Sequence, residues 1–226
     1  MAIEKSAKIF VAGHRGLVGS VVLRHLNCLG YTNLLFCTHS ELDLSDQSAV
    51  STFFTTHKPD YVILATAKVG GIHANATYPT DFLTINLQIE TNVITSLVSH
   101  NVKKLVFLGS SCIYPKFAPQ TIPESTLLTG PLEPLMSVVF CMEEYDGLEH
   151  VNVGSGKVVI IKELAELVKE VFRFKREIVW DGTKPDGTPR KFMDSSKLAK
   201  MGWEAKTSLR DGLVQTYKWY AENVKQ

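Results

Sequence analysis

Three glycines near the start of the chain, Gly13, Gly16 and Gly19, have the spacing of a turn that holds a dinucleotide. They follow a short apolar run at residues 9–12 and open a helical apolar pattern that begins at Leu17. The first glycine permits a tight turn, the second lets backbone approach a pyrophosphate, and the third lets the helix pack on the strand. The helix N-terminus adds free N–H groups and a favourable dipole. The spacing therefore predicts a dinucleotide phosphate site, the alternative being a tight strand–helix turn without a ligand.

The residues that would meet the adenosine ribose indicate which dinucleotide is bound. In NAD-binding folds a carboxylate holds the ribose hydroxyls soon after the second strand. Here no carboxylate follows the apolar residues 34–36 until Glu41. Arg15 in the turn and His39 after the strand are basic residues placed to meet a 2′-phosphate. We therefore predict NADP(H) in preference to NAD, the alternative for His39 being a solvated loop residue.

Strands alternating with helices must position these residues. The apolar runs and helical periods in the first half of the chain predict strands at 9–12, 34–36, 61–65 and 104–108. They also predict helices from 17, through Val50, Phe53 and Phe54, and over 79–100, and residues 43–46 offer caps for the second of these helices. This alternation predicts an α/β fold, a Rossmann-like doubly wound parallel sheet. In such a sheet ligands bind at the carboxyl ends of the strands. The glycine turn, the loop at 65–71, which we expect to be small and flexible, and residues 110–112 all fall at those ends.

The composition changes after Tyr114, where five prolines fall between residues 115 and 134 and indicate an ordered loop or a boundary. The patterns beyond it predict helices over 135–145 and 161–172, a short helix capped by Ser195 that ends near Gly202, a last helix from Ser208, and strands at 150–153 and 177–180. We therefore expect a cofactor-binding domain at 1–134 and a smaller second domain at 135–226.

The composition excludes several classes of protein. The chain has 226 residues, of which 45% are hydrophobic and 21% charged, and a net charge of +1. This balance is that of a soluble globular protein and favours neither nucleic acid nor a membrane as a partner. The start of the chain lacks the apolar stretch of a signal peptide. The four cysteines, Cys28, Cys37, Cys112 and Cys141, form no CxxC pair, so we expect reduced thiols, a cytoplasmic location and no metal site.

Five segments carry a specific resemblance to a known family. They are AGHRGLVGS, AKVGGI, LGSSCIYP, LEHVNVGSG and KPDGTPRK, in that order along nearly the whole chain. Together they resemble the GDP-L-fucose synthases, which are extended short-chain dehydrogenases/reductases. The resemblance implies NADP-dependent epimerisation and reduction of GDP-4-dehydro-6-deoxy-D-mannose to GDP-L-fucose. It also implies a GDP-sugar substrate, a homodimer, and a C-terminal region that is a remnant of the sheet edge and the nucleotide-sugar-binding domain.

The family's chemistry assigns roles to matched residues. A cysteine and a histidine move protons at the carbons that flank a ketone, a tyrosine assisted by a lysine protonates the reduced oxygen, and a serine holds that oxygen. The matched cysteine is Cys112, the matched serine is Ser110, and Asp186 resembles a contact to the nucleotide-sugar. Alternatively, Cys112 is a small buried hydrophobe, Ser110 caps a turn, and Asp186 serves only its Pro-Asp-Gly turn. The candidate cofactor-binding residues are Gly13, His14, Arg15, Gly16, Leu17, Val18, Gly19, His39, Leu108, Gly109, Ser110 and Ser111.

The chain departs from the family in two places. Members carry a Tyr-x-x-x-Lys helix soon after the proline-rich loop, but here residues 132–134 run directly into 135–137, and about a hundred residues, the size of a small domain, are absent. None of the seven tyrosines, Tyr31, Tyr61, Tyr78, Tyr114, Tyr145, Tyr217 and Tyr220, is followed by lysine four residues later. In addition, Cys37 stands where the family tends to carry arginine.

Three hypotheses follow from these observations. The motifs favour an enzyme of the family's kind. The missing Tyr-x-x-x-Lys pair favours a catalytically impaired or inactive dinucleotide-binding relic, because general acid–base catalysis is worth roughly 10²–10⁴-fold in rate. A chain that folds poorly is the third, since the apolar stripe of residues 79–100 would lose the helix that packs against it.

Overall fold

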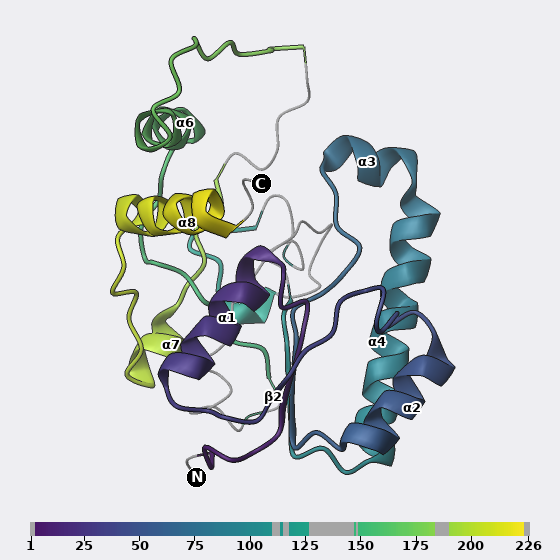
Figure 1. Ribbon diagram of the computed structural model, residues 1–226. Coiled ribbons are helices and arrows are strands. Elements are labelled where there is room, and N and C mark those ends of the chain that lie inside the picture. Colours follow the sequence, from purple (N-terminus) through teal and green to yellow (C-terminus); the bar gives the residue numbers. More distant parts are fainter. Residues whose placement is uncertain are drawn as a thin grey trace. The chain divides into compact units, whose positions relative to one another are not determined.

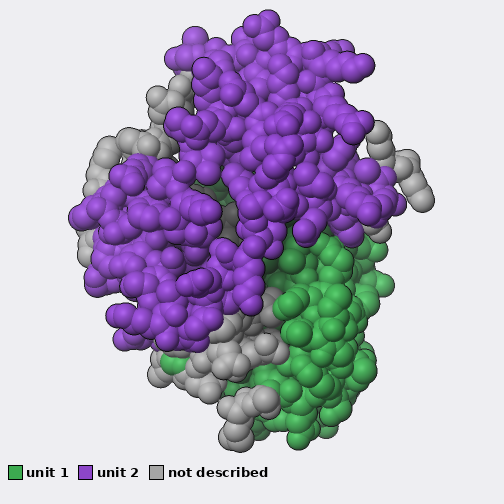
Figure 2. Space-filling view, turned by 90° about the vertical axis from the view of Figure 1, so that its left-hand side faces the viewer, with its two compact units in different colours: residues 1–109, 135–148 green, residues 110–134, 149–226 purple. Residues whose placement is uncertain are grey.

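The computed structural model describes residues 3–109, 114, 118–126, 147, 149–183 and 190–223. The chain divides into two compact units, which Figure 2 shows in different colours. Unit 1 comprises residues 1–109 and 135–148, and unit 2 comprises residues 110–134 and 149–226. The domain boundary predicted between residues 134 and 135 lies outside the described residues and stays a prediction.

Unit 1 contains a parallel four-stranded sheet. Its strands are β1 (Ile9–Ala12), β2 (Leu34–Leu35), β3 (Tyr61–Leu64) and β4 (Lys104–Phe107), in the spatial order β2-β1-β3-β4. All three neighbouring pairs run parallel, with Ile9 opposite Leu34 and Tyr61 in the two pairs that β1 makes. The four predicted strands are therefore present, and the predicted parallel, doubly wound α/β fold is confirmed.

Helices cover both faces of this sheet (Figure 1). On one face Ile9, Val11 and Ile63 pack with Val22 and Leu26 of α1 (Leu17–Cys28). The opposite face packs against α2 (Gln47–His57) and α4 (Pro79–Ser99). The buried side chains on that second face are Phe10, Ala12, Val62 and Leu64 from the strands and Val50, Phe53, Phe54, Val93 and Leu97 from the helices. Because successive strand side chains point to opposite faces, a sheet covered twice needs continuous apolar runs, which is the pattern of β1 and β3.

Specific polar contacts begin the helices and hold them in place. The Asp46 side chain accepts hydrogen bonds from the backbone N–H groups of Ser48 and Ala49, at 2.8 and 3.0 Å, and so caps α2 as predicted. The buried Asn92 of α4 donates to the carbonyls of Leu44 and Ser45, both at 3.0 Å, and thereby ties α4 to the segment before α2. A short helix, α3 (Ile72–Thr77), was not predicted.

Unit 2 has a smaller described core. Tyr114, Ala118 and Ile122 are buried together and pack with Met193. Around them the described chain forms a 3₁₀ turn, η1 (Glu124–Thr126), and the helices α6 (Ile161–Val171), α7 (Ser196–Lys200) and α8 (Leu209–Asn223). The predictions of helices from 161, after Ser195 and from 208 are confirmed, while the helix expected over 135–145 lies outside the described residues. None of the described helices has the length and apolar character needed to cross a membrane.

The prediction of two strands in unit 2 is wrong. Residues 150–153 and 177–180 form no strand in the structure. Around Asn152 each hydrogen bond involves a side chain, as a strand ladder would not: its backbone N–H donates to Oε1 of Glu124 at 3.0 Å, and its side-chain amide donates to the Ile122 carbonyl at 3.0 Å. At 177–180 an apolar run is present, but Val179 and Trp180 are exposed, so no buried face supports a strand.

Candidate functional site

The glycine turn at the end of β1 is shaped by close backbone contacts. Gly13 has φ of +84°, which side-chain-bearing residues rarely adopt, and a Cβ there would collide with the carbonyl of Ala65. A Cβ at Gly19 would collide with the Gly13 carbonyl. The turn thus lies against the chain that leaves β3, and α1 lies against the turn. The tight turn and the close packing of the helix are those that the first and third glycines predicted, while the approach of backbone to a pyrophosphate stays a prediction.

Within the described part of the chain, the N-terminus of α1 has no side-chain cap. Its N-cap residue, Gly16, has no side chain to accept from the first turn, and its backbone carbonyl accepts a hydrogen bond from the Ser20 N–H at 3.0 Å. The N-terminus of α2 differs, because the Asp46 carboxylate accepts from its first-turn N–H groups. Helix N-terminal N–H groups without such a cap, next to a glycine turn, suit a phosphate. The residues present therefore fit the pyrophosphate of a dinucleotide.

A half-buried histidine follows the first glycine. The His14 ring lies 4.9 Å from the ring of Phe36, measured between centroids, at an interplanar angle of 42°. Its Nδ1 atom is buried and has no hydrogen-bond partner within the part of the chain that the structure describes. A buried polar atom without a partner is costly, so this nitrogen is suited to bond to a bound molecule.

The loop after β2 carries the predicted basic residue His39. Its side chain is 84% exposed, and its Nδ1 atom lies 3.8 Å from Oδ1 of Asp43. In the same loop, Oε2 of Glu41 accepts from both the backbone N–H and the hydroxyl of Thr38, each at 2.7 Å. These bonds lower the pKa of Glu41, and the positive charges of Arg15 and His14 lower it further. Burial, and then the charge of Glu41, raises the pKa of the Cys37 thiol.

A side chain that the sequence analysis missed holds the loop at 65–71. Asn86 of α4 accepts from the Lys68 N–H at 2.7 Å and donates to the Lys68 carbonyl at 3.0 Å. The Lys68 amine lies 3.5 Å from the Asp81 carboxylate and 5.4 Å from the centre of the Phe82 ring. The loop, which we expected to be flexible, is thus pinned to α4. The sequence offered one signal for this contact, which is the polar Asn86 within the apolar helical pattern of residues 79–100.

The described cofactor-site candidates converge on one edge of the sheet. The Leu108 N–H donates to the Leu64 carbonyl at 3.2 Å and extends the pairing of β4 with β3 by one residue, and Gly109 follows in an exposed position. Because all four strands are parallel, their carboxyl ends share this edge. It holds the glycine turn, the loop with His39, the loop at 65–71 and residues 108–109. Ser110, Ser111, Cys112 and Asp186 lie outside the described residues, and their roles stay predictions.

Tyr114 of unit 2 is unsuited to replace the absent catalytic tyrosine. Its side chain is buried, its hydroxyl donates to Oδ1 of Asn152 at 2.6 Å, and Nε2 of His150 lies 3.0 Å from that hydroxyl. Burial, with the nearby charge of Glu124, raises its pKa to about 12. A tyrosine that protonates the oxygen of a reduced ketone needs a lowered pKa. The raised pKa and the buried hydrogen bonds of Tyr114 are instead those of a residue that stabilises the fold.

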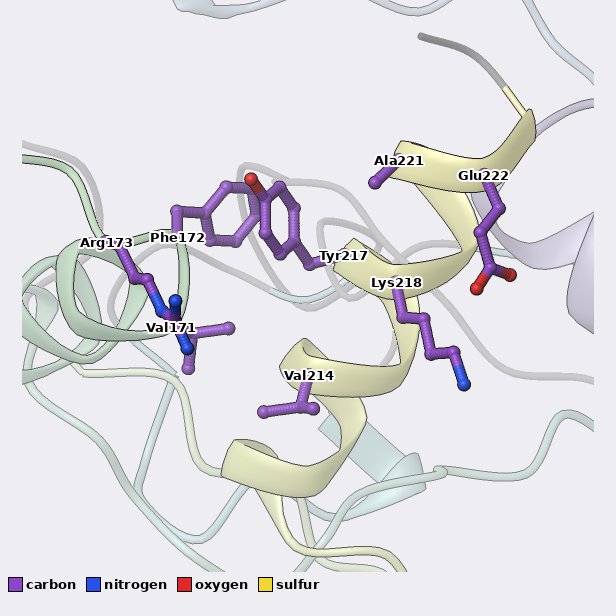
Figure 3. A pocket seen from close by; sticks show the side chains of 8 residues that line it. All are labelled: Val171, Phe172, Arg173, Val214, Tyr217, Lys218, Ala221 and Glu222. Carbon is purple, nitrogen blue, oxygen red and sulfur yellow. The ribbon is translucent and has the colours of Figure 1, made fainter.

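A shallow groove of about 420 Å³ lies between α6 and α8 in unit 2 (Figure 3). Its lining comprises Val171, Phe172, Arg173, Val214, Tyr217, Lys218, Ala221 and Glu222. The Phe172 and Tyr217 rings face each other, with centroids 4.2 Å apart, so each already covers the other. Across the described residues, no three histidine, cysteine or acidic side chains are grouped to hold a metal ion.

The matching family model decides the classification. Residues 9–137 match the family described as "NAD dependent epimerase/dehydratase family". The chain belongs to this family. The match begins at β1 and covers the glycine turn, all four strands of the sheet and the region after β4.

Curated relatives within the family match almost the whole chain. A protein of Arabidopsis thaliana named "Putative GDP-L-fucose synthase 2" is 52% identical over 310 residues, covering 99% of this chain and 94% of its own. The GDP-L-fucose synthase of Escherichia coli strain K12 is 34% identical over 312 residues, covering 96% and 97%. A solved GDP-mannoheptose C4 reductase from Campylobacter jejuni with NADP bound has a TM-score of 0.84 at 27% identity, covering 97% and 99%.

The length of the first alignment bears on the expected internal deletion. It spans 310 positions, whereas this chain has 226 residues. At least 84 positions (310 less 226) therefore face no residue of this chain. The difference supports a segment absent from this chain, as the family resemblance implied.

Proposed function

We propose that this chain is an NADP-dependent epimerase and reductase of the GDP-L-fucose synthase type, which converts GDP-4-dehydro-6-deoxy-D-mannose to GDP-L-fucose. The observation that carries the proposal is the 52% identity to the Arabidopsis relative over 99% of this chain. The uncapped N-terminus of α1 behind the glycine turn supports the cofactor part of it. A homodimer and a cytoplasmic location belong to the same proposal.

The proposal assigns each step of binding and catalysis to particular residues of this chain. The first-turn N–H groups of α1 hold the pyrophosphate, and Arg15 and His39 meet the 2′-phosphate. NADPH, when bound, supplies a hydride. Cys112 moves a proton at a carbon beside the ketone, where the carbonyl acidifies the C–H bond, and Ser110 holds the ketone oxygen. Asp186 contacts the GDP-sugar.

The runner-up is a chain that binds the cofactor and turns over weakly or not at all. The observation that favours it is the absence of a Tyr-x-x-x-Lys pair in the whole sequence. The raised pKa of Tyr114 gives it further support, because the tyrosine nearest in sequence to Ser110 is a poor proton donor near neutral pH.

Two measurements on the purified chain separate these candidates. NADPH binding is followed by its fluorescence, and NADPH consumption by its absorbance after the keto-sugar is added. Consumption that Cys112→Ser lowers strongly, with NADPH affinity unchanged, is the expected result. Binding without consumption would establish the runner-up, and no binding of NADPH would refute both. Size-exclusion chromatography of the same sample tests the homodimer.

A further inference from the structure

Glu41 occupies a chemically informative position. It is the first carboxylate after β2, the region where NAD-binding folds place the carboxylate that holds the ribose hydroxyls. In the structure, one oxygen of the Glu41 carboxylate is already bonded to Thr38. Oε2 accepts from the N–H and from the hydroxyl of Thr38, both at 2.7 Å, and the Thr38 hydroxyl also lies 3.0 Å from that of Ser40. The Glu41 side chain is therefore fixed to its own loop.

Backbone hydrogen bonds also hold this loop in a turn. The N–H groups of Glu41 and Leu42 both donate to the Thr38 carbonyl, at 3.1 and 2.9 Å. His39 lies within this turn, with its side chain exposed to solvent. These two backbone bonds and the two bonds from Thr38 to Oε2 of Glu41 hold the Glu41 carboxylate on one short, ordered loop, which also carries His39.

The charge of Glu41 interacts with Arg15, one of the two cations expected to hold a 2′-phosphate. The charges of Arg15 and His14 favour the ionised form of Glu41, on the loop that also carries His39, the second of those cations. The His14 ring packs on Phe36, next to the start of the same loop, and leaves its buried Nδ1 atom unpartnered among the described residues. A phosphate placed among these cations would lie close to a fixed carboxylate, and like charges repel.

We propose that Glu41 is a specificity-determining residue for the cofactor, whose Thr38-bound carboxylate weakens the binding of NADPH relative to NADH. The inference rests on the proposed function, since it presumes that the chain binds NADP(H) at the glycine turn. The chain thus discriminates between the two dinucleotides less than Arg15 and His39 alone would allow. This effect adds to the absence of an arginine at position 37.

The test is a fluorescence titration of NADPH and NADH into the full chain and into Glu41→Gln. Glutamine keeps an oxygen that accepts from Thr38, so the loop stays closed while the charge is removed. The dissociation constant for NADPH is expected to fall roughly two- to fivefold, the size of an exposed charge pair, while that for NADH stays the same. The gain should shrink as salt is added, because salt screens exposed charges.

A matched control isolates the position of the charge. Glu163→Gln removes another exposed carboxylate, one that accepts from the backbone N–H of Ile160 at 3.4 Å at the start of α6. It should leave both dissociation constants unchanged. Circular dichroism spectra and melting temperatures that match the parent chain show that the variants remain folded.

A double-mutant cycle with Arg15→Gln tests whether the effect operates through the cation. The gain from Glu41→Gln should disappear when Arg15 is already replaced, since the two charges are coupled.

Other outcomes contradict the inference in distinguishable ways. If NADH binding weakens in Glu41→Gln and NADPH binding is unchanged, the carboxylate holds the ribose hydroxyls. If both constants stay the same, Glu41 has no part in selectivity. Binding of neither cofactor by the parent chain refutes the proposed function itself, and the inference with it.

Discussion

Units 1 and 2 differ in how completely they bury their apolar faces. In unit 1 the strands β1 and β3 are covered on both sides, and residues of α1, α2 and α4 complete the two clusters. In unit 2, α6 has a strongly amphipathic sequence but contains no buried residue, and the four residues at 158–161 before and at its start are all exposed. Strand β1 is thus fully buried and β3 is buried in all but its first residue, whereas the apolar face of α6 is only partly buried among the described residues, although it lies next to α8.

The tryptophans make this comparison measurable. All three, Trp180, Trp203 and Trp219, lie in unit 2. Tryptophan fluorescence therefore reports on unit 2, while far-ultraviolet circular dichroism reports on the helices of both units. A substitution that acts on one unit should move one signal more than the other.

The largest loss of stability is expected from Phe54→Ala in α2. Phe54 is fully buried, 6.3 Å from Phe10 and 5.9 Å from Phe53 between ring centroids. The cavity should cost about 3–5 kcal/mol of unfolding free energy, measured by urea titration with circular dichroism. Ile161→Ala, at an exposed position that starts α6, should stay within about 0.5 kcal/mol. Similar losses in the two variants would contradict the difference between the units.

The glycine turn should be the next most sensitive feature. Gly13→Ala combines a positive φ with a backbone collision at Ala65, and we expect a loss of about 3 kcal/mol together with loss of NADPH binding. Gly30 has a similar φ of +82° but no atom within 4 Å of a new Cβ. Gly30→Ala should therefore cost only about 1–2 kcal/mol and leave NADPH binding intact. Equal effects would show that strain alone, without close packing, sets the requirement at Gly13.

The third largest loss of stability is expected from removing a buried polar contact of unit 2. Asn152→Ala removes the acceptor for the Tyr114 hydroxyl and the donor to the Ile122 carbonyl, and leaves both buried groups without these partners. We expect a loss of about 1–3 kcal/mol, seen by tryptophan fluorescence. The exposed Asn27 also donates from its side chain, to the Leu23 carbonyl at 2.9 Å, and Asn27→Ala should change little. A shift confined to circular dichroism would place the effect outside unit 2.

The N-termini of α1 and α2 offer a reciprocal test. Asp46→Ala removes the cap of α2 and should cost about 1 kcal/mol without affecting the cofactor. Gly16→Asp introduces a cap at α1, where the backbone angles of −71° and 166° suit any residue but the new Cβ would lie 3.2 Å from the Gly13 carbonyl oxygen. The new carboxylate would occupy the N–H groups and repel phosphate, so the affinity for NADPH should fall about tenfold, while the close Cβ contact should lower the melting temperature only slightly. Unchanged affinity would place the pyrophosphate elsewhere.

The sequence was most informative where a local pattern carries the structure. The strands β1 and β3, the tight turn at Gly13 and the Asp46 cap each depend on neighbouring residues, and each is confirmed. Contacts between distant residues were not predictable in this way. Asn86 holds Lys68 across 18 positions, and Asn152 bonds to Ile122 across 30. The strand expected at 150–153 is absent for the same reason, because a distant partner took up the hydrogen bonds of Asn152.

The smallest expected effect is a difference between two ion pairs in how their contribution to stability depends on pH. Asp60 accepts from the Lys8 N–H at 3.0 Å and from the Lys103 amine at 2.7 Å, and these bonds lower its pKa from the ordinary 3.8. A lowered pKa stabilises the fold above the unfolded value, and this contribution is lost as pH falls from 3.8 through the folded value. Asp60→Asn should cost below about 1 kcal/mol at pH 7, because the pair is partly exposed, and should converge with the parent chain in acid.

The matched pair in unit 2 joins Glu170 of α6 to Arg210 of α8, at 2.7 and 2.9 Å. These contacts lower the pKa of Glu170 as well, but the carboxylate is fully exposed. Because solvent screens it and the two helices bury little between them, Glu170→Gln should not shift the urea midpoint measurably at any pH. A larger loss for Glu170→Gln than for Asp60→Asn would show that charge pairs, and not apolar burial, hold the helices of unit 2 together.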